Sequence, residues 1–249
     1  MKDQLYKYLL LLGDNSMILG HRLSELCGHG PNLETDIALT NISLDLFGQV
    51  RSYFKYAATL KEGETEDSIA FLRFERDYYN TILVEQPNKD FAHVIVRQFL
   101  FDAYHKPLLE QLMNSKDETI SAIAHKSIKE SKYHLRFSSE WVKRLGDGTE
   151  ISHQKTQNAF NTLMPYIEEL FIETPLELAM KNEGIGADLN LVKASFDKTM
   201  SDVLPSANIE TSDIKLRKTN GKSGFHSEYL GFILTELQYM QRAYPDMSW

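Results

Sequence analysis

The sequence has little of what interrupts helices. Its 249 residues include only 13 glycines and 7 prolines, about 8% of the chain against a usual share of roughly 12%. Alternating runs of β-branched residues are also scarce, so we predict no β-sheet. With 42% apolar and 25% charged residues, the chain is not disordered or of low complexity. These features favour an all-α protein with long helices.

Cysteine, basic runs and long apolar runs are scarce as well. The single Cys27 excludes an internal disulfide and a cysteine-rich zinc or iron–sulfur module, and we expect it to pack at a helix end. The longest apolar run, Tyr8–Leu12, is far shorter than the roughly 20 residues that span a bilayer. The net charge of −8 disfavours nucleic acid. No signal-peptide pattern opens the chain, so we expect a cytoplasmic protein without membrane or nucleic-acid partners.

Turn-forming residues divide the first 148 residues into five candidate helices of an antiparallel bundle. The breaks lie at 28–31, 62–64, 86–88, 115–117 and 146–148. Residues 149–249 are predicted to add helices over 152–172, 175–181, 189–203 and 226–243, with a polar loop over 205–225. No solenoid repeat or Pro-rich linker is present, so we expect residues 1–249 to form a single domain.

Two candidate helices place carboxylates at the centre of apolar faces. In 91–113, Asp102 and His105 lie three positions apart on such a face, and are therefore neighbours on the helix surface. In 69–84, which we predict to be helical, Glu75 lies at the centre of the apolar face. Both carboxylates are predicted to point inward.

Two further helices repeat the pattern. Segment 120–142 carries Glu130 and His134 along the edge of its apolar stripe. Segment 33–60 is apolar around most of its circumference, so we expect it to be central, and it carries a polar stripe of Asn41, Asp45 and Gln49. A buried helix would not carry that stripe without polar partners.

Four helices that each direct a carboxylate inward are typical of di-iron carboxylate bundles, in which two of the helices also carry Glu-x-x-His. The histidines do not follow that pattern here. Tyr78 and Tyr133 occupy the third positions after Glu75 and Glu130, and His134 comes one position late. The spacing therefore indicates a degenerate metal site, with candidate residues Asp45, Glu75, Asp102, His105, Glu130 and His134.

A buried network of hydrogen bonds and ion pairs is the alternative, and the spacing favours it because metal affinity depends on a full ligand set. Its counterparts would be tyrosine hydroxyls or basic side chains, namely Arg73, Arg76, Arg97 or Lys106.

Motifs outside the bundle are weaker. Gly221-Lys222-Ser223 ends like a phosphate loop, but Leu216 replaces the required first glycine. His226-Ser227-Glu228 has deaminase spacing without a Cys-x-x-Cys partner, and is predicted to start the last helix. A solvated loop is favoured over phosphate contacts for the basic residues Lys215, Arg217, Lys218 and Lys222.

Several short motifs, taken together, resemble the C subunits of bacterial phenylacetyl-CoA epoxidase, also called phenylacetic acid degradation protein C. The resemblance covers nearly the whole chain. It rests on Leu12-Gly13-Asp14-Asn15, Cys27-Gly28-His29, Leu44-Asp45-Leu46 with Gly48-Gln49, 83–88, Lys129-Glu130 with 133–138, and Leu237-Gln238-Tyr239 with Gln241-Arg242.

The resemblance implies a ferritin-like fold. It also implies a hetero-oligomer in which a paralogous A subunit holds the catalytic di-iron centre, the C subunit is structural, and a reductase subunit with flavin and iron–sulfur groups supplies electrons from NADPH. Phenylacetyl-CoA would be epoxidised on its ring with O2. We therefore expect no catalytic residue and no cofactor on this chain, with the A subunit, other subunits and a second copy as partners. Two rival hypotheses are a self-sufficient di-iron oxygenase that uses the six candidate residues, and a carrier in a homo-oligomeric ferritin-like shell.

Overall fold

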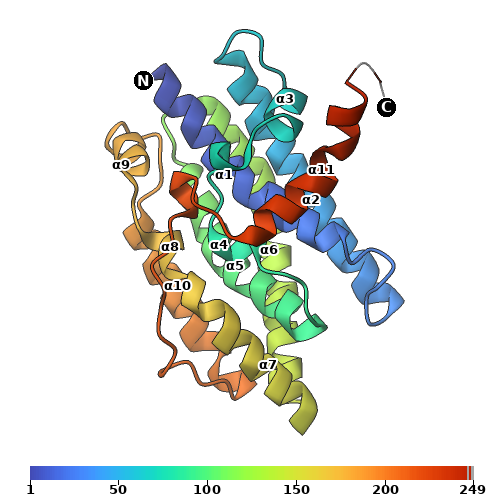
Figure 1. The fold of residues 1–249 in the computed structure, drawn as a ribbon. Helices are drawn as coiled ribbons and strands as arrows, with labels where there is room; N and C mark the ends of the chain where they lie inside the picture. Colours follow the sequence, from blue (N-terminus) through green and yellow to red (C-terminus); the bar gives the residue numbers. More distant parts are fainter. Residues whose placement is uncertain (246, 248–249) are drawn as a thin grey trace.

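Four long helices form an antiparallel, ferritin-like bundle in the computed structural model, which describes residues 1–245 and 247 (Figure 1). They are α1 (Lys2–Ser24), α2 (Leu33–Thr59), α5 (Phe91–Leu112) and α6 (Glu118–Gly146). Short turns join α1 to α2 and α5 to α6, so each pair packs as a hairpin, and α2 contacts α6 between the pairs. The described residues contain no β-strand, which confirms the all-α prediction.

Side-chain caps start the helices at the predicted breaks. Asn32 accepts a hydrogen bond from the amide of Thr35 at the start of α2, and Asp90 accepts one from His93 at the start of α5. Asp117 caps α6 in the same way. Each cap satisfies amides that have no partner within the helix, so the five predicted breaks are confirmed.

The most enclosed helix is α5, not α2. Helices α6, α7 (Glu150–Leu163) and α10 (Leu189–Val203) pack around α5, and most of its side chains are buried. By contrast, α2 exposes Leu33, Ile37 and Leu44. The prediction that segment 33–60 is the central helix is therefore wrong, because its apolar residues extend onto a face that this chain leaves uncovered.

The crossover between the two hairpins is not the helix predicted over 69–84. It consists of α3 (Glu66–Phe71), a 3-10 turn (Glu75–Asp77), an extended segment and α4 (Ile82–Glu85). The extended backbone is held from α1, because Asp14 accepts from the amide of Tyr79 at 2.8 Å and Asn15 accepts from that of Thr81 at 2.9 Å. These bonds replace the helical ones, and the prediction of a continuous helix is wrong.

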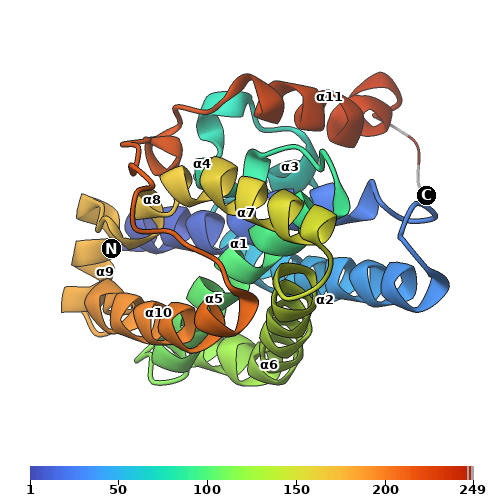
Figure 2. The same ribbon diagram turned by 90° about the horizontal axis from the view of Figure 1, so that it is seen from below.

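The C-terminal part follows the predicted order with one interruption. The helix predicted over 152–172 is divided into α7 and α8 (Glu168–Phe171) by a 3-10 turn that contains Pro165, whose ring nitrogen has no hydrogen to donate. The predicted helices α9 (Pro175–Asn182) and α10 are confirmed, and α11 (Glu228–Ala243) starts two residues later than predicted. Figure 2 shows α11 and α6 on opposite sides of the molecule.

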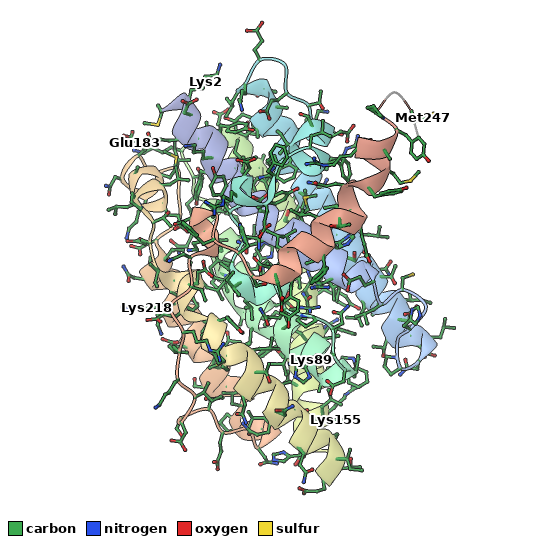
Figure 3. All side chains as sticks on the ribbon, viewed as in Figure 1. Lys2, Lys89, Lys155, Glu183, Lys218 and Met247 are labelled. Atoms are coloured by element: carbon green, nitrogen blue, oxygen red, sulfur yellow. The ribbon has the colours of Figure 1, made fainter. Side chains whose placement is uncertain are left out.

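The polar segment over 205–225 is a loop, as predicted, with 3-10 turns at Pro205–Ala207 and Gly221–Ser223. Its Lys222 is buried, and the Nζ atom lies 2.9 Å from Glu177 Oε1. That lysine is therefore unavailable to a phosphate. Lys215, Arg217 and Lys218 are exposed, and Figure 3 shows Lys218 on the surface.

Two smaller predictions concern Cys27 and the membrane. Cys27 is exposed in the turn after α1, so the expectation that its side chain packs at the helix end is wrong. In the residues that the structure describes, no helix has both the length and the apolar character that a membrane span requires.

Candidate functional site

Five of the six predicted site residues lie on α2, α5 and α6, and the sixth does not join them. Glu75 is exposed and lines a surface cavity against α11. The prediction that Glu75 points inward is wrong, because α3 ends at Phe71 and the helical face on which the prediction rested does not exist.

Asp45 and His134 connect α2 to α6. His134 Nε2 lies 2.9 Å from Asp45 Oδ2. The histidine side chain is fully buried, whereas the aspartate side chain is 34% exposed. The pair therefore lies at the edge of the interior, and the imidazole fills the inner position.

Asp102 connects α5 to α6. Its carboxylate accepts hydrogen bonds from Ser138 Oγ at 2.8 Å and from Gln98 Nε2 at 2.7 Å. Complete burial raises the pKa of Asp102 to about 7, although His134 and the two hydrogen bonds lower it. The predicted inward orientation of Asp102 is confirmed.

His105 and Glu130 complete the group. Burial lowers the pKa of His105 to about 3, so its imidazole is neutral at pH 7, and its ring centroid lies 4.9 Å from that of Phe101. Glu130 is half-buried, and burial together with the charge of Asp45 raises its pKa. Gln49 Nε2 approaches Glu130 Oε2 to 3.5 Å, at the limit for a hydrogen bond.

Buried polar atoms without hydrogen-bond partners are concentrated on the same three helices. In the described part of the chain they include Gln49 Oε1, Gln98 Oε1, His105 Nδ1, Ser131 Oγ and His134 Nδ1. Such atoms are rare in protein interiors. The interior between α2, α5 and α6 is therefore polar, as the helix faces predict.

The donor geometry does not fit a di-iron centre. The two oxygens of Asp102 face Ser138 and Gln98, and His134 Nε2 faces Asp45 instead of a shared point. Within residues 1–245 and 247, no three of the candidate residues bring ligand atoms within 4.8 Å of one another. A carboxylate-bridged metal pair needs such convergence.

The basic residues expected in a buried network have other partners. Arg73 pairs with Asp14, and Lys106 Nζ lies 2.8 Å from Glu110 on the surface. Arg97 donates to the backbone oxygen of Gln86 and to Asn88. Arg76 is exposed beside the ring of Phe225. In the described residues, the carboxylates of the candidate site on α2, α5 and α6 therefore make their hydrogen-bonding contacts with Gln, Ser and His side chains, not with Arg or Lys.

Several buried carboxylates are absent from the predicted candidate residues, and Glu85 on α4 is one of them. It accepts hydrogen bonds from Asn80 Nδ2 at 2.9 Å and from the amide of Ser227 at 2.9 Å, and its Oε1 lies 2.6 Å from His226 Nδ1. The other ring nitrogen of His226 lies 2.9 Å from the backbone oxygen of Tyr78. Glu85 comes directly after the apolar run 82–84, and this position is the sequence signal that could have identified it as buried.

The sequence pattern of the family described as phenylacetic acid catabolic protein matches residues 1–249. The chain belongs to this family. Within the family, it is 45% identical over 247 residues to the C subunit of 1,2-phenylacetyl-CoA epoxidase from Escherichia coli (strain K12), an alignment that covers 99% of this chain and 100% of the relative. The resemblance to C subunits that the short motifs indicate is confirmed.

Proposed function

We propose that the chain is the non-catalytic C subunit of a 1,2-phenylacetyl-CoA epoxidase and that it binds and stabilises a paralogous, di-iron A subunit. The observation that carries the proposal is that the inward carboxylates are engaged by neighbouring side chains. Asp45 is in hydrogen-bonding contact with His134, and Asp102 accepts hydrogen bonds from Ser138 and Gln98. The full-length match to the C subunit of a 1,2-phenylacetyl-CoA epoxidase is the basis for the reaction that we propose for the complex.

The proposal assigns the inward polar groups a structural role. The Asp45–His134 contact joins α2 to α6, and the Asp102–Ser138 bond joins α5 to α6. Polar contacts at fixed positions favour one helix register over its alternatives. In the proposed complex, the A subunit would hold the iron, and the electrons from NADPH would arrive through a reductase subunit with flavin and iron–sulfur groups.

Co-expression with an A-type subunit tests the partner. We expect a hetero-oligomer by light scattering, in which this chain also contacts a second copy of itself, and cytoplasmic recovery of the complex. A homo-oligomeric shell that does not bind the A subunit would contradict the proposal and favour the carrier hypothesis.

Metal analysis tests whether this chain binds iron itself or leaves iron binding to the A subunit. The rival hypothesis, a self-sufficient di-iron oxygenase, has one observation in its favour, since five of its six candidate ligands lie on three adjacent helices. We expect the isolated chain to contain no stoichiometric iron after expression in iron-rich medium. About two irons per chain, with O2 consumption by the chain alone, would favour the rival.

A variant in the complex separates the two hypotheses further. With NADPH, O2 and phenylacetyl-CoA, we expect the complex that contains Asp45→Asn to turn over within about twofold of the original, because the amide still accepts a hydrogen bond from His134. Glu118→Gln, which neutralises an exposed carboxylate at the start of α6, is the matched control. Loss of turnover in Asp45→Asn alone, with an intact complex, would indicate a catalytic ligand.

A further inference from the structure

A second group of metal-ligating side chains lies outside the bundle interior, where α11 crosses the end of α1. His21 and Glu25 are four positions apart at the end of α1, and Glu236 comes from α11. One ligand atom from each of the three residues lies within 4.8 Å of the other two. In the described residues, this is the one group of three or more His, Cys, Asp or Glu side chains that meets that criterion.

The imidazole of His21 has a ring nitrogen that no hydrogen bond to the described residues occupies. His21 Nε2 is buried from solvent and has no hydrogen-bond partner in the described structure. Burial also lowers the pKa of His21, so the ring is neutral at pH 7 and has a lone pair to donate. A buried nitrogen without a partner is unfavourable unless something binds it.

The two carboxylates keep acceptor capacity for an ion. Glu25 accepts hydrogen bonds from Arg22 Nη1 at 3.0 and 3.2 Å and from Asn88 Nδ2 at 3.0 Å, which leaves part of its acceptor capacity free. Glu236 is exposed. Ligand atoms on one tetrahedral ion lie about 3.4 Å apart, so shifts of about 1 Å in flexible side chains would suffice.

We propose that His21, Glu25 and Glu236 bind a divalent transition-metal ion and thereby fasten α11 to α1. One imidazole and two carboxylates suit Zn²⁺, with water in the remaining position. Imidazole disfavours Mg²⁺ and Ca²⁺, which prefer all-oxygen sites. The proposal does not rest on the epoxidase function, because none of its three residues belongs to the candidate site on α2, α5 and α6.

Calorimetry with Zn²⁺ on the untagged full-length chain tests the site. A Cys27→Ser background is used, because the exposed thiol would itself bind zinc. We expect one ion per chain and a rise in the thermal midpoint that EDTA reverses. His21→Ala and Glu236→Gln should each weaken binding at least tenfold, and His125→Ala and Glu62→Gln, at exposed positions, should not.

Cobalt(II) gives an independent readout, since a tetrahedral site with nitrogen and oxygen ligands gives visible absorption bands. The bands should disappear in Glu236→Gln, an exposed substitution that leaves the helix intact even if His21→Ala destabilises the fold. Absence of stoichiometric Zn²⁺ binding, or binding that is unchanged in either variant, would overturn the proposal.

Discussion

At the scale of single residues, the interior contains ionisable groups whose pKa values depend on their surroundings. Asp102 and His226 are the two with the clearest consequences. Asp102 is buried without a cation in hydrogen-bonding contact, whereas His226 lies between a carboxylate and a backbone oxygen. Each makes the free energy of unfolding depend on pH in its own range.

Asp102 binds its proton more tightly in the folded state, because burial raises its pKa from 3.8 to about 7. The folded chain therefore holds more protons than the unfolded chain in this range, and stability decreases as the pH rises from about 4 to about 7. Asp102→Asn should remove this dependence and raise the unfolding free energy at pH 8 by on the order of 2–4 kcal/mol. Urea titrations at pH 5.5 and 8 measure it, and an unchanged pH dependence would refute the assignment.

His226 is a base, whereas Asp102 is an acid, but its effect on stability has the same direction: the free energy of unfolding decreases as the pH rises. The adjacent Glu85 carboxylate and the Tyr78 backbone oxygen raise its pKa above 6.5, against the effect of burial. Its stabilising contribution is complete below pH 6.5 and is lost as the pH rises through the folded-state pKa. The titration of Asp102 overlaps this range, because its folded-state pKa is about 7. In an Asp102→Asn background, His226→Gln should therefore flatten the stability profile that remains above pH 6.5. Equal slopes with and without His226→Gln in that background would contradict a charged imidazole.

At the scale of elements, the middle of α1 determines the shape of the crossover. Asp14 and Asn15 lie within an otherwise apolar buried helix, and their side chains bind the backbone of 79–81. Gly13, one residue earlier, lets α2 approach, because a Cβ there would collide with the ring of Phe54. Three successive residues thus place two elements against α1.

Removing one partner of the Asp14–Arg73 ion pair should destabilise the fold more than replacing both. The Asp14 side chain is fully buried, and the Arg73 side chain is 9% exposed. Arg73→Ala would leave a buried carboxylate without its cation and should lower the unfolding free energy by about 3–5 kcal/mol. The double variant Asp14→Asn/Arg73→Met should recover part of that loss. Arg51→Ala, at a pair whose arginine side chain is 75% exposed, is the control and should cost less than ~1 kcal/mol.

The two glycines of α1 that face α2 should respond differently to alanine. A Cβ on Gly20 would lie 3.1 Å from Phe47 Cε1, and Phe47 is only half-buried, so we expect its ring to shift by the small distance required. Phe54 is buried, so Gly13→Ala should cost about 1–3 kcal/mol through overpacking, whereas Gly20→Ala should be near neutral because alanine favours helix. Chemical denaturation of both variants measures the difference, and equal values would contradict the packing argument.

At the scale of the whole molecule, the exposed apolar residues of α2 show where this chain leaves a helix face uncovered. Leu33, Ile37 and Leu44 are at least half exposed. Exposed apolar groups of this kind are common at interfaces but do not identify a partner. If the proposed A subunit binds this chain, the thermal stability of the chain should rise.

A partner that binds only the folded chain raises its stability by mass action. At an A-subunit concentration about 100 times Kd, the gain is about 2.7 kcal/mol, or roughly 5–10 °C in the thermal midpoint of this chain. Thermal precipitation followed by gel electrophoresis reports the two chains separately. Serum albumin at the same concentration is the control, and an unchanged midpoint would contradict the proposed partnership.

The sequence by itself determined the local features: helix periodicity, the breaks between helices and the inward direction of Asp102. These depend on residues within a few positions of one another, which is why spacing encodes them. Only the tertiary structure decided that residues 72–81 leave the helical path and that Glu75 turns outward. The competing hydrogen bonds come from α1, more than 60 positions away. The meeting of His21 with Glu236 likewise depends on where α11 crosses α1, a geometry that helical spacing does not specify.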